Sequence, residues 1–288
     1  MHRVVCAVNE SLYYQMLCKG LLMSLLKHRS MPCKITVLLD GKHSQPLNDL
    51  RKHIEIVYVK PLDIICGSVS SRTTFARLEI PYIFPYERRI LYLDIDTYII
   101  NDIHELFTIP FETIAAVVPG THLMIKELIT REFRTNLKKM DYELDGINYS
   151  VGLEDHKYFN AGIMLMDSYK WRELRIKQHA EALVRAHPSA MYTSDEMALN
   201  LIFRGHLTEL RQCYNTFSFA EKDLTESPRI WHFNTYKPII HAPLAQFYNW
   251  LSIFKTKDQI ILKNLEEISK RFGKAAMLAL KSQDYSET

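Results

Sequence analysis

Two aspartates that could bind a cation follow directly after an apolar segment. Asp94 and Asp96 come after residues 89–93, whose composition is that of a buried strand. If that strand belongs to a parallel sheet, the pair lies at the carboxyl edge, where open α/β sheets bind their ligands. Residues i and i+2 of an extended segment point to the same side, so the two carboxylates would converge. Because converging carboxylates repel one another, the pair predicts a site for Mg²⁺ or Mn²⁺, with a solvated loop as the plainer alternative.

A second kind of chemistry uses a similar pair of aspartates. The run Asp94-Ile95-Asp96-Thr97 also resembles the nucleophile motif of phosphatases of the haloacid-dehalogenase type, in which the first aspartate attacks phosphorus. That motif usually opens its domain, and a later GDxxxD-like acidic pair holds the magnesium. Here several predicted strands precede Asp94 and no GDxxxD sequence follows it, so the phosphatase is the weaker alternative.

Short apolar runs alternate with longer amphipathic segments, which predicts an α/β fold with a mostly parallel sheet covered by helices. We expect strands at residues 4–8, 35–39, 54–59, 89–93, 114–118, 163–166, 207–210 and 230–233. We expect helices at residues 12–28, 73–84, 124–138, 168–186 and 195–204. No linker or internal repeat divides the chain, so one domain over residues 1–250 and a helical, Lys-rich tail over residues 251–288 are predicted.

Composition and charge exclude several classes of function. The 36 basic and 33 acidic residues of this 288-residue chain nearly balance, which argues against nucleic-acid binding driven by a positive field. The five cysteines are odd in number and lack CxxC spacing, so we expect free thiols in a reducing compartment. No apolar run is long enough for a membrane span or a signal peptide, so a cytoplasmic protein is expected. The basic residues of the tail could touch an anionic membrane, although a packing helix is the simpler interpretation.

Four segments, in order, resemble the retaining glycosyltransferases of family 8, which include glycogenins and bacterial lipopolysaccharide galactosyl- and glucosyltransferases. The first runs from Arg77 through the acidic pair. The others are the FNAGIMLM run at residues 159–166, the SDEMALN run at residues 194–200, and WHF at residues 231–233 with Lys237-Pro238. The resemblance spans residues 3–241. It implies a Rossmann-like GT-A fold, a Mn²⁺ or Mg²⁺ ion and a nucleotide-diphosphate-sugar donor, most often UDP-linked.

The resemblance also implies roles for single residues. Asp94, Asp96 and His232 would hold the metal, although a lone histidine in an apolar strand can also be a packing residue. Lys237 would neutralise the diphosphate of the leaving nucleotide, and its plainer interpretation is a surface lysine. Arg77 would contact the donor, or it could pair with Glu79 or another neighbouring acid. The full set of expected donor-contacting residues is Ala7, Asn9, Tyr13, Arg77, Asp94, Ile95, Asp96, Asn160, Ala161, Gly162, Asp195 and Lys237.

Two departures from the family pattern bear on the chemistry. The glycine expected after His232-Phe233 is missing and the spacing to Lys237 is one residue shorter, so the phosphate loop differs. Glu196 stands where the family usually has glutamine, directly after Asp195. As catalytic residues we therefore expect Asp195 and Glu196, the latter stabilising an oxocarbenium-like sugar or attacking it as a nucleophile. A salt bridge or a solvated helix position is the alternative for Glu196.

The function expected from the sequence is metal-dependent transfer of a hexose, from UDP-glucose or UDP-galactose, with retention of configuration. The acceptor would be a glycan or a glycolipid. Residues 120–157, where the family often builds acceptor-side structure, contain several aromatic residues that could stack on a sugar. A catalytically silent protein that binds a nucleotide sugar is the remaining alternative, against which the intact set of Asp94, Asp96, Asp195 and His232 argues.

Overall fold

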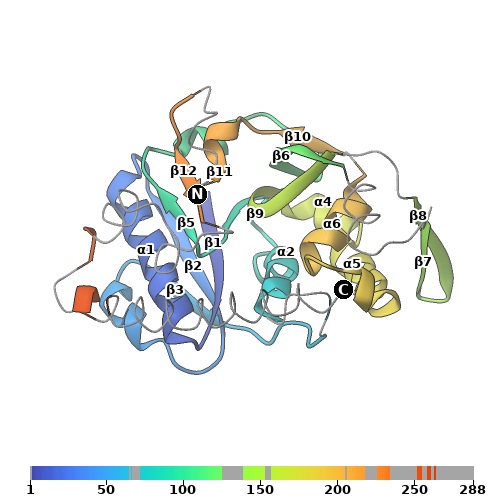
Figure 1. The fold of residues 1–288 in the computed structure, drawn as a ribbon, viewed down its shortest axis with the longest axis horizontal. Helices are drawn as coiled ribbons and strands as arrows, with labels where there is room; N and C mark the ends of the chain where they lie inside the picture. The colour runs from blue at the N-terminus through green and yellow to red at the C-terminus, as the bar shows by residue number, and fades with distance from the viewer. Residues whose placement is uncertain are drawn as a thin grey trace, which may run out of the picture.

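The computed structural model describes residues 2–64, 66, 72–124, 139–152, 157–204, 206–217, 226–233, 252–254, 258–260 and 263. Its centre is a seven-stranded sheet with the strand order β10-β6-β9-β4-β1-β2-β3 (Figure 1). The strands are β1 (His2–Asn9), β2 (Cys33–Asp40), β3 (Glu55–Tyr58), β4 (Arg89–Leu93), β6 (Ala115–Met124), β9 (Lys157–Asp167) and β10 (Leu207–Glu209). All neighbours are parallel except β9, which runs antiparallel to β4 and β6. The predicted mostly parallel α/β sheet is therefore confirmed.

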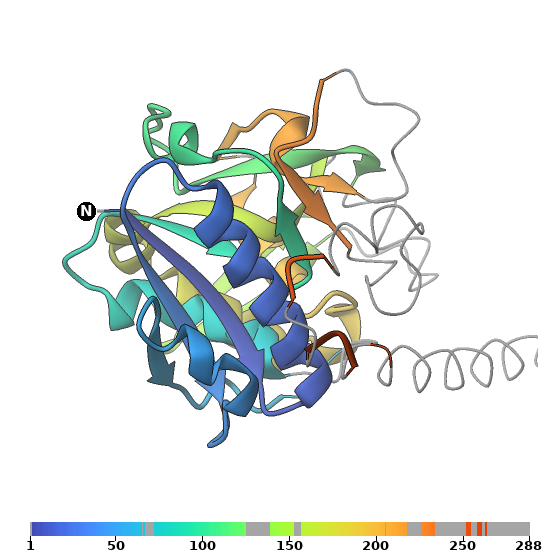
Figure 2. The same cartoon turned by 90° about the vertical axis from the view of Figure 1, so that its left-hand side faces the viewer.

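Helices cover both faces of this sheet, because alternate strand residues are apolar on both sides. Val4, Cys6 and Val8 pack with α1 (Leu12–His28), which lies along one face (Figure 2). Val5 and Ala7 face the opposite layer. That layer contains the 3-10 segment η2 (Arg72–Glu79) and the helices α2 (Ile80–Ile83), α4 (Ser168–Glu173), α5 (Ile176–Ala186) and α6 (Asp195–Phe203). Short 3-10 turns are η1 (Gln45–Leu50), η3 (His104–Phe107), η4 (Pro188–Ala190) and η5 (Gln212–Tyr214).

Two smaller sheets complete the described fold. The strands β5 (Thr97–Ile99), β11 (Thr216–Phe217) and β12 (Ile230–His232) form a sheet with the order β11-β12-β5. In it β12 runs antiparallel to β5, with His232 opposite Thr97. A hairpin of β7 (Lys139–Leu144) and β8 (Ile147–Gly152) lies beside α5, where the Tyr142 hydroxyl is 2.8 Å from His179 Nδ1. The small three-stranded sheet is what brings a late strand to the end of β4.

Three expected elements differ in the structure. The helix predicted at 73–84 is a 3-10 segment followed by one α-helical turn, because Pro81 lacks the N–H that a continuous helix would need. The helix predicted at 168–186 is divided at Arg175, whose φ of 53° is left-handed. Residue 124, predicted as the start of a helix, ends β6, and residues 125–138 lie outside the described residues.

The C-terminal tail is described only at residues 252–254, 258–260 and 263, so its predicted helix lies mostly outside the described residues. The described part contacts the core: the Phe254 side chain is buried with Trp231 and Phe233. Among the described residues, no helix combines the length and the apolar character that crossing a membrane requires.

Candidate metal and donor site

The acidic pair lies in a tight turn between β4 and β5. Both the backbone N–H and the side-chain hydroxyl of Thr97 donate to the backbone carbonyl of Asp94, at 3.1 and 2.7 Å. The sequence expectation of an extended segment is therefore wrong, because the turn reverses the chain after Asp94 instead of continuing β4. The carboxylates of Asp94 and Asp96 converge through this turn, and not through strand alternation.

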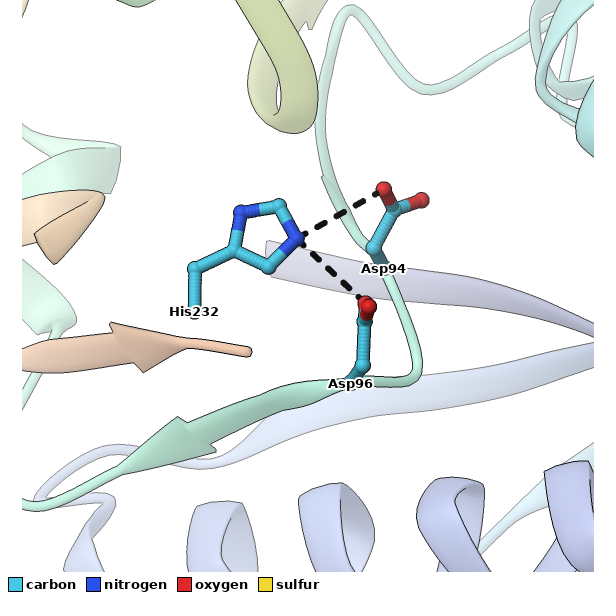
Figure 3. Close-up of side chains that lie close together, drawn as sticks. All are labelled: Asp94, Asp96 and His232. Atoms are coloured by element: carbon cyan, nitrogen blue, oxygen red, sulfur yellow. Dashed lines mark ion pairs between the residues drawn. The ribbon is translucent and has the colours of Figure 1, made fainter. Parts of the chain in front are cut away.

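His232 at the end of β12 approaches both carboxylates. Its Nε2 lies 3.3 Å from Asp96 Oδ1 and 3.9 Å from Asp94 Oδ2 (Figure 3). One ligand atom from each of these three residues lies within 4.8 Å of the others. The Phe233 N–H donates to the Asp96 carbonyl at 2.9 Å, which ties the histidine strand to the turn. The structure thus brings together all three residues that the sequence predicted as metal ligands.

The surroundings of this cluster fit a cation. His232 Nε2 is a buried atom without a hydrogen-bond partner among the described residues, and burial lowers the pKa of this histidine. If the lone pair of this neutral ring nitrogen faces the two carboxylates, they repel it unless a cation lies between them. Gly162 keeps the space open, since a Cβ there would lie 2.3 Å from His232 Cε1 and 2.7 Å from Asp94 Oδ2. Two carboxylates and one imidazole are a donor set suited to a divalent ion such as Mn²⁺ or Mg²⁺.

The position of the cluster in the sheet agrees with a ligand site. β1 and β4 are parallel neighbours, with Val5 opposite Tyr92, so Asn9 and Asp94 follow the same edge of the sheet. From β1 the sheet continues through β2 and β3 on one side and through β4 on the other. This is the topological switch point at which open α/β sheets bind ligands.

Arg77 joins the cluster to the start of α6. Its Nε lies 2.7 Å from Asp195 Oδ2, and its Nη2 lies 3.4 Å from Asp94 Oδ1. Its Nη1 donates to the Ala161 carbonyl at 2.6 Å. Burial alone would lower the pKa of Arg77, but the Asp195 and Asp94 carboxylates outweigh burial and raise it. Burial raises the pKa of Asp195 to about 6, against the lowering effect of Arg77. Arg77 therefore pairs with these two aspartates. It does not pair with Glu79, which pairs with Lys177.

Glu196 is buried and held by three donors. Its Oε1 accepts a hydrogen bond from the Tyr158 hydroxyl, and its Oε2 accepts from Asn160 Nδ2 and from the Ala161 N–H, both at 2.8 Å. Burial raises the pKa of Glu196 to about 7, although the Tyr158 and Ala161 hydrogen bonds act to lower it. The alternative of a solvated helix position is therefore wrong, since only 9% of Glu196 is exposed.

The other residues predicted to contact the donor lie near the same edge of the main sheet, except one that lies outside the described residues. Asn9 ends β1, and its Oδ1 accepts from the Ser11 N–H at 3.0 Å. Ala7 is buried two residues earlier. Tyr13 lies on α1 with its ring edge-to-face against Tyr14, at 5.2 Å between centroids. Ile95, in the acidic turn, packs against the apolar clusters on the α1 side. Lys237 lies outside the described residues.

Two residues around the cluster were not predicted from the sequence. Asn215 Oδ1 lies 2.8 Å from His232 Nδ1, and the Tyr92 hydroxyl donates to Asp94 Oδ1 at 2.7 Å. Tyr92 could have been found, because it precedes Asp94 by two residues and so points to the same side of β4. Asn215 lies in none of the four motifs, so its contact with His232 is seen only in the folded structure.

Comparison with known families and proteins agrees with this geometry. Residues 6–239 match the model of the family described as Glycosyl transferase family 8. General stress protein A of Bacillus subtilis is 23% identical over 240 residues, which are 76% of this chain and 74% of that protein. The lipopolysaccharide 1,2-glucosyltransferase of Escherichia coli is 25% identical over 190 residues, which are 64% of this chain. The chain spans only 49% of that enzyme and 43% of a relative from Haemophilus influenzae.

Solved structures give the same fold at low identity. The galactosyltransferase LgtC, solved with donor and acceptor sugar analogues, matches with a TM-score of 0.67 at 19% identity, over 87% of this chain and 94% of LgtC. GlyE of Streptococcus pneumoniae matches with a TM-score of 0.62 at 22% identity, over 92% of this chain and 63% of GlyE. The predicted GT-A fold is therefore confirmed.

Proposed function

Because this chain belongs to glycosyl transferase family 8, we propose that it transfers a hexose from a nucleotide diphosphate sugar to a glycan or glycolipid acceptor. The observation that carries the proposal is the cluster of Asp94, Asp96 and His232 at the switch point of the sheet. A divalent ion held there, Mn²⁺ or Mg²⁺, would neutralise the charge that develops on the leaving diphosphate. The haloacid-dehalogenase alternative loses its support, since the matched family consists of glycosyltransferases.

We assign the nucleotide to the edge formed by the end of β1 and the start of α1. Asn9 and Tyr13 lie there, and UDP is the donor that the family resemblance favours. Lys237 would contact the diphosphate. Gly162 would allow the donor to approach the protein backbone closely. A side chain would obstruct this approach, because even a Cβ at this position meets His232 and Asp94. As the transferred sugar we propose glucose or galactose.

On the sugar side we assign Asn160 and Asp195 as hydrogen-bonding residues. Asn160 is half-buried between Glu196 and Asn215, and Asp195 pairs with Arg77, whose other nitrogen reaches Asp94. These contacts support a donor position in which the sugar lies next to the metal ligands. They hold the polar groups in place before the donor binds, which lowers the reorganisation needed in the reaction.

For Glu196 we propose electrostatic stabilisation of the oxocarbenium-like sugar in preference to covalent attack. Three hydrogen bonds to its two oxygens reduce the nucleophilicity of the carboxylate. Retention of configuration would then follow from attack on the same face as the leaving group. The variant Glu196→Gln keeps the acceptor for Asn160 and Ala161, so we expect it to lose less than about tenfold in kcat, which corresponds to roughly 1.4 kcal/mol of barrier. A loss of several orders of magnitude, together with a trapped glycosyl-enzyme seen by mass spectrometry, would support the nucleophile instead.

The proposal as a whole is tested by thermal unfolding with UDP-glucose, UDP-galactose and GDP-mannose, each with and without Mn²⁺. A true donor present at about 100 times its Kd stabilises the folded state by about 2.7 kcal/mol. The matched control is Asp94→Asn/Asp96→Asn, in which the shift with Mn²⁺ should disappear. Absence of a shift with every donor would refute the proposal.

Turnover then separates an enzyme from a silent binding protein. Release of the nucleoside diphosphate should require Mn²⁺ or Mg²⁺, and it should accelerate when oligosaccharide or glycolipid acceptors are added. Binding without nucleotide release under any of these conditions would favour the silent alternative. Contact of the C-terminal tail with an anionic membrane stays a prediction, which vesicle co-sedimentation of the full chain would test.

A further inference from the structure

A continuous row of hydrogen bonds connects Glu196 to His232 through two asparagine side chains. Asn160 Nδ2 donates to Glu196 Oε2 at 2.8 Å, and Asn215 Nδ2 donates to Asn160 Oδ1 at 3.3 Å. At the far end, Asn215 Oδ1 lies 2.8 Å from His232 Nδ1. Glu196 lies on α6, Asn160 on β9, Asn215 after η5 and His232 on β12. The row therefore joins four separate parts of the fold.

The orientation of each amide in this row is determined by its neighbours. The Gly162 N–H is a donor, so the Asn160 atom 3.0 Å from it must be the oxygen. The other Asn160 atom faces Glu196 Oε2, which also accepts from the Ala161 N–H, and must therefore be the nitrogen. Amide orientations assigned in this way rest on the network, which here begins from two backbone N–H groups of fixed character.

The same reasoning reaches the histidine. Asn215 must present its nitrogen to Asn160 Oδ1, so the atom that it presents to His232 is its oxygen. An amide oxygen only accepts hydrogen bonds, and the facing Nδ1 must therefore carry a proton. In a neutral imidazole this leaves Nε2 without a proton.

We infer that Asn215 is a positioning residue that holds His232 in the Nδ1–H form, so that the Nε2 lone pair faces Asp94 and Asp96. This inference deepens the proposed function, since it rests on the metal site proposed above. The opposite form would direct an N–H into the acidic pair, where it would satisfy the carboxylates and exclude the cation. In metal sites of other proteins, loss of such a supporting partner weakens metal binding by about 10–100-fold.

The first measurement needs no metal. In the metal-free protein at pH 8, long-range ¹H–¹⁵N correlation spectra distinguish a protonated Nδ1 from a protonated Nε2. Because the chain contains 12 histidines, the His232 signals are identified by their loss in His232→Gln. We expect Nδ1–H in the wild type, and a mixture or the Nε2–H form in Asn215→Ala. An Nε2–H form in the wild type would overturn the inference.

The second measurement is the Kd of Mn²⁺, determined by electron paramagnetic resonance without donor. Asn215→Ala should weaken binding by about 10–100-fold. Asn215→Asp keeps an acceptor for Nδ1–H but has no donor for Asn160 Oδ1, so in the nitrogen spectra it should retain the Nδ1–H form of His232. Equal affinity of Asn215→Ala and the wild type would contradict the inference.

Asn200 offers a matched control for general destabilisation. It is as buried as Asn215, at 2% exposure, but its side chain bonds to the backbone of Phe159 and Glu196. Asn200→Ala should lower the Tm without changing the form of His232. The failures of the two proposals are also distinct: a wild type with Nδ1–H that binds no Mn²⁺ refutes the metal site, whereas an Nε2–H wild type that binds Mn²⁺ refutes only the role of Asn215.

Discussion

Arg77 and Asp195 form an ion pair that is almost completely withdrawn from solvent. The side chains are 4% and 1% exposed, and Arg77 Nε lies 2.7 Å from Asp195 Oδ2. Such a pair adds little net stability compared with apolar residues, but removal of one partner leaves an uncompensated buried charge. The pair therefore fixes the position of the arginine that also reaches Asp94.

Replacement of the arginine should consequently be severe. We expect Arg77→Met to lower the free energy of unfolding by about 3–5 kcal/mol, as measured by urea denaturation at pH 7.5. The control is Lys139→Met, whose partner Asp141 lies at 3.2 Å but whose pair is 63% and 58% exposed. That variant should change stability by less than about 1 kcal/mol. Similar losses in both variants would mean that burial of the Arg77 pair has no special effect.

The raised pKa of Glu196 predicts a specific pH dependence of stability. Its pKa is raised from 4.5 to about 7, chiefly by burial, so the folded state favours the protonated carboxyl. This contribution is fully present below pH 4.5 and is lost as the pH rises to about 7. At about 1.4 kcal/mol for each unit, the loss is on the order of 3 kcal/mol.

Glu196→Gln cannot titrate, so its stability relative to the wild type should increase between pH 4.5 and pH 7. Urea denaturation of both proteins at pH 5 and pH 7.5 measures the change. Glu209→Gln, at a side chain that is 63% exposed, serves as the control and should give the same difference at both pH values. A constant difference for Glu196→Gln would show that the carboxyl is ionised throughout this range.

Much of the fold follows from local pattern in the sequence. The apolar spacing predicted a helix at 12–28, and α1 has those bounds, although residues 15–22 are buried on all sides and not on one face alone. The acidic pair was also predicted as a cation site, because it follows an apolar strand, whereas His232 was expected beside it only from the family resemblance. Strand ends of this kind are recognisable without knowledge of the tertiary contacts.

Other features depend on contacts between distant residues and could not be predicted. Leu174 and Arg175 are good helix formers, yet the chain turns there between α4 and α5. Asn215 is 55 residues from Asn160 and 17 from His232, and nothing in its local sequence indicates either contact. The reversal of β9 likewise depends on its pairing with β4 and β6, not on its own residues.

The contact of the C-terminal segment with α1 gives a third prediction. Lys19 Nζ lies 3.0 Å from Asp49 Oδ2 and 3.1 Å from Asp258 Oδ2, and the lysine side chain is 3% exposed. Asp258→Ala should release the segment, lower the free energy of unfolding by about 1–3 kcal/mol and accelerate C-terminal cleavage in limited proteolysis. Asp49→Ala also leaves Lys19 with one carboxylate but should not release the segment. Equal cleavage rates in the two variants would contradict this docking.

A methyl group at Gly162 should disrupt the cluster of Asp94, Asp96 and His232. A Cβ there would lie 2.3 Å from His232 Cε1, 2.7 Å from Asp94 Oδ2 and 2.9 Å from Asn160 Oδ1, so at least one of these groups must move. The ring of His232 is buried and hydrogen-bonded to Asn215, which leaves it little freedom. We expect Gly162→Ala to weaken Mn²⁺ binding by at least about tenfold, since displaced ligands no longer converge.

The hairpin glycine Gly146 separates this effect from simple loss of stability. Its φ of 78° makes alanine unfavourable by roughly 1–2 kcal/mol, but a Cβ there would meet no atom of the described residues within 4 Å. Gly146→Ala should therefore lower the Tm while the Kd of Mn²⁺, measured by electron paramagnetic resonance, remains that of the wild type. If Gly162→Ala binds Mn²⁺ as tightly as Gly146→Ala, the space beside Asp94 and His232 does not hold the cation, and the metal must bind elsewhere.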